Sequence, residues 1–144
     1  TLFFLYSLCS LSNIIFESLK IDENGAYFET LKWLAYQKWE NQHASSPDFQ
    51  CPHCGENTTG FEYDSDSGNC SCCGKEVFLT DMIGFHLDMS EDSAPDSVAS
   101  SYMLILETLM LFTIIRILWS FSDRTLFSNT LFIKDGPLTL RSQY

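Results

Sequence analysis

Four of the six cysteines in this sequence have the type and spacing of a metal site. They form two Cys-x-x-Cys pairs, each followed by glycine: Cys51 with Cys54, and Cys70 with Cys73. Fifteen residues lie between the pairs. Zn²⁺ takes four soft ligands at the corners of a tetrahedron, and two such knuckles supply four thiolates. The pattern predicts a zinc ribbon over residues 49–80.

The predicted zinc site is closed, because protein sulfur fills every coordination position. Such a site is structural: it folds a loop-rich segment that cannot bury enough core by itself. One alternative stays open, since Cys72 could replace Cys70 or Cys73 as a ligand. We expect His53 to face solvent and Cys9 to be a small core residue.

Charge and cysteine usage limit the partners and the compartment. The chain has 144 residues, 19 of them acidic and 8 basic, for a net charge of −11. Sequence-independent DNA binding relies on clustered Lys and Arg, so this segment alone is not expected to coat DNA. Tightly paired cysteines favour metal over disulfides, which indicates a reducing, cytoplasmic compartment. Free or disulfide-bonded cysteines are the alternative interpretation.

Helices are expected on both sides of the ribbon. An apolar run at residues 3–20 and an amphipathic pattern at 26–42 predict a helical N-terminal part over residues 1–48. A connector and a long apolar helix follow the ribbon over residues 81–122, with the helix itself at 98–121.

The helix at 98–121 is long enough to span a membrane. Two charges argue against this, because Glu107 and Arg116 fall on opposite faces of a helix and each costs roughly 2.5–3.5 kcal/mol to insert. We expect a helix buried in a soluble protein, where each charge finds its own partner, with no membrane contact. A zinc protein tethered to a membrane by this helix is the alternative.

The last segment, residues 126–144, holds a second candidate site. An apolar run there leads into Asp135 and a glycine, and Asp-Gly after a β-like run usually makes a turn. The order of features nevertheless resembles one family. The CPxCG ribbon, "FLTD" at 78–81, His86, the long apolar helix and "TLFIKDGPL" at 130–138 are together similar to NurA-domain nucleases that carry a zinc ribbon.

This resemblance implies an α/β fold. An RNase H-like mixed sheet would begin with "TLFIKDG" as its opening strand, preceded by the helical N-terminal part and the inserted four-cysteine zinc ribbon. Asp135 would be the first catalytic carboxylate and would bind Mn²⁺ or Mg²⁺, hard ions that prefer carboxylate oxygens. Asp81 and His86 match the family by position, and we interpret them as structural or interface residues.

The implied function is metal-dependent cleavage of DNA by a homodimer docked on a hexameric HerA-type ATPase, in DNA end processing or anti-phage defence. The family has further acidic residues after the first aspartate. We therefore expect the sequence to be part of a longer protein, and this part alone to be inactive. The competing hypothesis is a non-catalytic zinc-ribbon interaction module that scaffolds a complex, with Asp135 in an ordinary turn.

Overall fold

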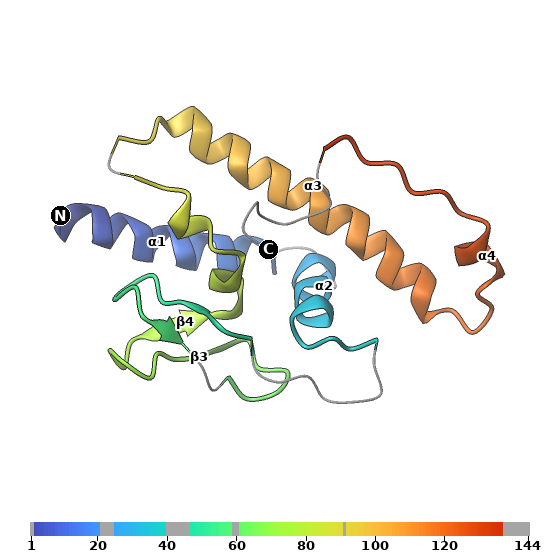
Figure 1. Ribbon diagram of the computed structural model, residues 1–144, viewed down its shortest axis with the longest axis horizontal. Coiled ribbons are helices and arrows are strands. Elements are labelled where there is room, and N and C mark those ends of the chain that lie inside the picture. Colours follow the sequence, from blue (N-terminus) through green and yellow to red (C-terminus); the bar gives the residue numbers. More distant parts are fainter. Residues whose placement is uncertain (1, 21–24, 40–46, 59–60, 91, 137–144) are drawn as a thin grey trace.

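The computed structural model consists of helices with two very small sheets on one side of them (Figure 1). The structure describes residues 2–20, 25–39, 47–58, 61–90 and 92–136. For residues 2–9 and 95 it describes the backbone alone. The main helices are α1 (Leu2–Ser18), α2 (Ala26–Ala35) and α3 (Pro95–Ser120). A single turn of helix, α4 (Thr125–Ser128), follows α3. Cys9 lies in α1, and its side chain is outside the described part.

Two antiparallel hairpins make up the ribbon. Strand β1 (Phe49–Gln50) pairs with β2 (Asn57–Thr58), and β3 (Ser67–Asn69) pairs with β4 (Glu76–Phe78). Each hairpin carries one cysteine pair in its turn. Two short 3-10 helices, η1 (Leu79–Ile83) and η2 (Phe85–Leu87), then lead back toward the helices. Small antiparallel sheets that carry the cysteines agree with the predicted zinc ribbon.

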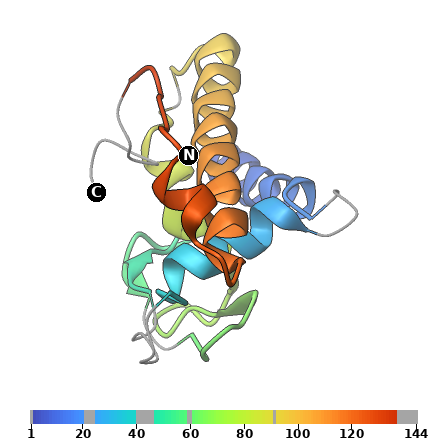
Figure 2. The same ribbon diagram turned by 90° about the vertical axis from the view of Figure 1, so that its right-hand side faces the viewer.

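The main core lies where α1, α2, η1 and α3 meet, with α1 and α2 on the same side of α3 (Figure 2). Leu31 and Leu109 are fully buried there. The remaining buried members of this core are Ile15, Phe16, Leu19, Phe28, Tyr36, Leu79, Ile83, Phe85 and Ile105. The residues from α1 and α2 lie far along the sequence from those of α3, so this core joins the helices before the ribbon to the long helix after it.

Polar contacts fix how α2 and α3 cross. Thr30 Oγ1 and Thr113 Oγ1 lie 2.8 Å apart in the buried contact, and Arg116 Nε donates to Thr30 Oγ1 at 3.1 Å. Arg116 therefore has a partner inside the protein, as expected. Glu107 lies on the exposed side of α3. Among the described residues, α3 is the only helix long and apolar enough to span a membrane. Only 22% of its most apolar stretch is buried, so the expectation of a buried helix is wrong for most of α3.

Ion pairs hold the loop between the two hairpins on the helices. Lys32 Nζ lies 3.1 Å from Asp64 Oδ1 and 2.8 Å from Asp66 Oδ1, and Lys20 Nζ lies 2.7 Å from Asp66 Oδ2. Lys38 also pairs with Asp64, and its hydrogen bond lowers the pKa of that carboxyl. Partial burial raises the pKa of Asp66, but hydrogen bonds from Lys20 and Lys32 outweigh this and lower it overall.

Two predicted elements differ from the structure. The helix predicted at 26–42 ends at Ala35, and Gln37 then adopts a positive φ of 47°, which an α-helix cannot continue through. The strand predicted at 130–136 is absent: these residues have no regular secondary structure. A strand needs a neighbour for its backbone hydrogen bonds, and the described part of the chain offers none here. Residues 137 and 138 lie outside the described part.

The packing of the core predicts that two leucines of α3 contribute differently to the stability of the fold. Leu109→Ala should reduce the free energy of unfolding by about 2–5 kcal/mol, because it leaves a cavity in a fully buried site. Leu104→Ala is the matched control: Leu104 is 57% exposed, and its loss should change stability by less than about 0.5 kcal/mol. Urea unfolding of the zinc-loaded chain measures both. Equal losses would contradict the burial of Leu109.

Candidate metal centre

The four cysteines of the two knuckles come together in space. The sulfur atoms of Cys51, Cys54, Cys70 and Cys73 all lie within 4.8 Å of one another. Sγ of Cys51 is 3.9 Å from that of Cys73, and Sγ of Cys54 is 3.7 Å from that of Cys70. Tetrahedral zinc with bonds of about 2.3 Å places its sulfurs about 3.8 Å apart. The four side chains therefore fit a zinc ion, as the sequence predicts.

The two knuckles have the same backbone geometry. The Gly55 N–H donates to the Cys51 carbonyl at 2.9 Å, and the Gly74 N–H donates to the Cys70 carbonyl at 2.8 Å. Both glycines have positive φ, 76° and 69°, in the region that residues with a Cβ rarely adopt. The glycine after each cysteine pair thus lets the chain turn around the sulfurs. In the first knuckle, the His53 N–H also donates to Cys51 Sγ, at 3.4 Å.

The four thiols differ in exposure. Cys51 and Cys70 are buried, whereas Cys54 is exposed. Burial raises the pKa of Cys51 to about 12, so zinc has to displace a proton from this thiol when it binds at neutral pH. Cys72 is exposed and is not part of the four-sulfur group. The structure therefore favours Cys70 and Cys73 as the ligands of the second knuckle.

His53 has a role that the sequence did not indicate. We expected it to face solvent, but its Nε2 lies 2.9 Å from the carbonyl oxygen of Glu76, to which it can donate a hydrogen bond. This contact joins the first knuckle to β4 of the second hairpin. His53 therefore braces the two halves of the ribbon against each other beside the sulfurs.

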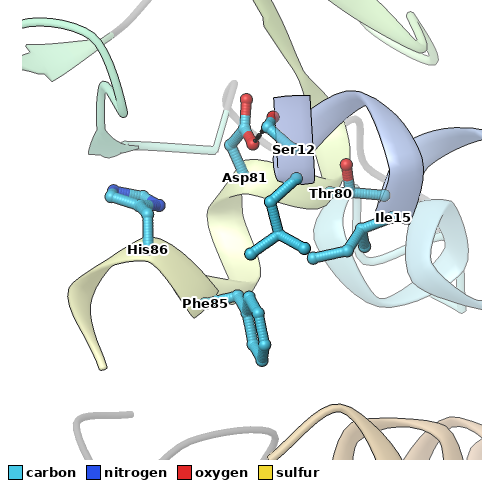
Figure 3. A pocket seen from close by; sticks show the side chains of 7 residues that line it. Ser12, Ile15, Thr80, Asp81, Phe85 and His86 are labelled. Carbon is cyan, nitrogen blue, oxygen red and sulfur yellow. Dashed lines mark hydrogen bonds between the residues drawn. The ribbon is translucent and has the colours of Figure 1, made fainter. Parts of the chain in front are cut away.

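Asp81 connects the ribbon to α1. Its Oδ2 accepts the Phe78 N–H at 2.8 Å, and its Oδ1 accepts the Ser12 hydroxyl. Figure 3 shows Asp81 beside Ser12 in a small cavity that His86 also lines. Burial raises the pKa of the Asp81 carboxyl. The cavity measures about 10 Å³, enough for about one water molecule, so it has no room for a substrate. These contacts agree with a structural role for Asp81.

Asp135 belongs neither to the four-cysteine cluster nor to the cavity beside Asp81. It is exposed, in a segment without regular structure, and its backbone carbonyl accepts a hydrogen bond from Lys134 Nζ at 3.3 Å. The next residue, Gly136, has a φ of 94°. The cysteine cluster is the only group of three or more potential metal ligands in the described ranges, so Asp135 joins no acidic cluster there.

No protein-family model matches this chain, and no curated protein or solved structure matches it either. A centre with four protein sulfurs leaves no open position for water or substrate, so its role is structural. Any catalysis needs groups elsewhere in the protein.

Replacing the ligands one at a time tests the zinc centre. Serine at position 51, 54, 70 or 73 should lower the zinc content well below about one ion per chain, because three sulfurs cannot close the site. Cys72→Ser is the matched control and should keep its zinc. Metal analysis after dialysis gives the stoichiometry. Retention of zinc by the Cys73 variant and its loss from the Cys72 variant would reverse the ligand assignment.

The hydrogen bonds of Asp81 predict that replacing this residue destabilises the fold. Asp81→Ala should reduce the free energy of unfolding by about 1–3 kcal/mol, because the Phe78 N–H and the Ser12 hydroxyl lose their acceptor. When Asp81→Ala is already present, Ser12→Ala should reduce the free energy of unfolding little further, because the Ser12 hydroxyl has already lost its acceptor. Unfolding measurements on the two single variants and the double variant give the coupling energy. Purely additive losses would show that the two side chains do not interact.

Proposed function

We propose that this chain is part of a metal-dependent DNA nuclease of the NurA type. The support comes from the sequence order: a closed zinc ribbon, then "FLTD", a long apolar helix and "FIKDG". One structural observation is compatible with it, namely that the Asp135 carboxylate is exposed beside a glycine of positive φ. A metal and a phosphate backbone can approach such a carboxylate, whereas the zinc centre is closed to both.

In this proposal Asp135 is a ligand of a catalytic Mn²⁺ or Mg²⁺. Such an ion activates water and stabilises the charge that builds up on the phosphate being cleaved. One carboxylate alone holds a divalent ion weakly, so further acidic residues of the complete protein complete the site. The segment that carries Asp135 contacts the helices through Phe132, whose ring centroid lies 6.0 Å from that of Phe127 in α4.

The charge of the chain fits a nuclease that receives DNA from a partner. A net charge of −11 repels DNA, so a hexameric HerA-type ATPase would deliver the substrate to a docked homodimer. The setting would be DNA end processing or anti-phage defence in the cytoplasm, without membrane contact. The ribbon and the helices then form the rigid part that places the nuclease on the motor.

A specific observation favours a second candidate, a non-catalytic interaction module. Helix α3 exposes large apolar side chains, which is typical of a surface that binds another protein. In this case the ribbon and α3 assemble a complex, and Asp135 makes an ordinary turn before Gly136.

Cleavage of DNA by the full-length protein separates the two candidates. With Mn²⁺ and the partner ATPase present, Asp135→Ala should lower the cleavage rate by a factor of about 100 or more, because the ion loses a ligand. Asp92→Ala is the matched control, since Asp92 is also an exposed aspartate in a turn, and it should cleave like wild type.

Zinc content and unfolding of both variants show whether the protein remains intact. Equal cleavage by wild type and Asp135→Ala, or no cleavage by wild type under any of these conditions, would favour the interaction module. Cleavage that is lost in both variants would point to a general effect of surface charge and not to a role of Asp135 in binding metal.

A further inference from the structure

Helix α3 carries a second apolar stripe on its exposed side. The stripe consists of six positions with alternating spacings of four and three residues, and all but one are apolar: Met103, Glu107, Met110, Ile114, Ile117 and Phe121. The apolar members are between 46% and 61% exposed. Alternation of four and three is the repeat of residues that form the seam between two paired helices.

The stripe lies opposite the face that α3 buries in its own protein. At about 100° per residue, the five members within α3 fall within an arc of roughly 80°, and Phe121 is the residue directly after the end of the helix. The buried side chains of Ile105, Thr108 and Leu109 lie on the other side of the helix. A helix that is apolar on all sides normally has all sides covered. The fold described here covers one side of α3 and leaves the stripe in contact with solvent.

We propose that the stripe is an interface with the same stripe of a second copy of this chain, and that the two α3 helices pair antiparallel about a two-fold axis. An interface of this kind is self-complementary, because each stripe contacts its own reverse. Reversal about position 112 places Met103 against Phe121, Met110 against Ile114 and Glu107 against Ile117. Every apolar position of the stripe therefore receives a side chain from the other copy.

Glu107 decides the direction of the pairing. In a parallel, in-register pair, this carboxylate would face its own copy across the seam, and two like charges directly opposite are destabilising. In the antiparallel pair, the two Glu107 side chains are separated along the axis, and each lies beside Ile117 with its carboxylate at the edge of the contact. A single polar position among apolar ones fixes register in paired helices in the same way.

Glu107 also argues for a protein partner over a bilayer. A lipid-facing stripe with an acid near its middle would have to bury that charge in hydrocarbon, whereas a helix pair leaves its edges open to water. The opposite face of α3 is packed on α2, where Arg116 donates to Thr30. The half-exposed apolar side chains offer on the order of 500 Å² per copy, hence on the order of 1,000 Å² in the pair, which reaches the lower limit for a specific interface.

This inference deepens the homodimer of the proposed nuclease by naming its contact surface. The surface is argued from α3 alone, so the inference and the nuclease proposal can fail separately. Dimerisation is measured as molecular mass, and nuclease activity is measured as cleaved DNA. If the chain dimerises through α3 but does not cleave DNA, the interface proposal stands and the nuclease proposal fails.

The first experiment measures the mass of the zinc-loaded chain by sedimentation equilibrium. Wild type should be a dimer at concentrations on the order of 100 µM, and Ile114→Glu should weaken dimerisation at least about tenfold. Leu126→Glu is the matched control, because Leu126 is 63% exposed and lies outside the stripe. A monomeric wild type, or a chain that instead binds to phosphatidylcholine vesicles, would overturn the proposal. So would equal weakening by both variants.

The second experiment tests direction, in chains that also carry Cys9→Ser and Cys72→Ser so that only zinc-bound cysteines remain. Met103→Cys and Phe121→Cys are made in separate chains that differ in mass. Antiparallel pairing predicts that dissolved oxygen oxidises the mixed chains to a disulfide between the two different variants and forms none within either variant alone. Disulfide-linked dimers of Met103→Cys with itself would show parallel pairing and overturn the antiparallel arrangement.

Discussion

The fold of the ribbon depends on four sulfur atoms that have to share one small volume. Its strands are two or three residues long, too short to be stable as hairpins without further support. Its buried hydrophobic cluster consists of Phe49, Cys51, Phe61, Cys70 and Val77, and two of these five are cysteines of the metal centre. A core this small cannot order the whole ribbon by itself. We therefore expect zinc binding and folding of the ribbon to be one process.

Folding of the ribbon also affects the helical part, because ribbon side chains contact helical residues that lie far away in the sequence. Asp81, which follows β4, accepts the Ser12 hydroxyl of α1, and Asp66 pairs with Lys20 and Lys32. Met82 packs against both the ribbon core and the helical core. These links are partly buried, so they position the ribbon more firmly than exposed ion pairs would. Loss of zinc would remove the ordered partner of each link at once.

Local geometry explains which features could be predicted from sequence. The zinc ligands follow from spacing because Cys-x-x-Cys-Gly fixes its own turn, and α3 was placed within three residues because its apolar pattern is long. The end of α2 was not predicted correctly, because it depends on the positive φ that Gln37 adopts. The links of Asp81 and Asp66 join residues 34 to 69 positions apart, and no periodicity indicates them. The strand at 130–136 was expected from a β-like run and from the family resemblance, but a strand also requires a neighbour.

Helix α3 shows why the same pattern allowed several interpretations. Its sequence is apolar on two opposite faces, and hydropathy cannot distinguish a face that packs on α2 from one that meets lipid or a second chain. The structure separates them, because it assigns Leu109, Thr113 and Arg116 to the inner contact. The exposed side of α3 carries the regularly spaced stripe, which includes Glu107. At the edge of a contact between two proteins this charge can remain in water, whereas in a bilayer it cannot, and this difference is the reason for proposing that two copies of α3 pair.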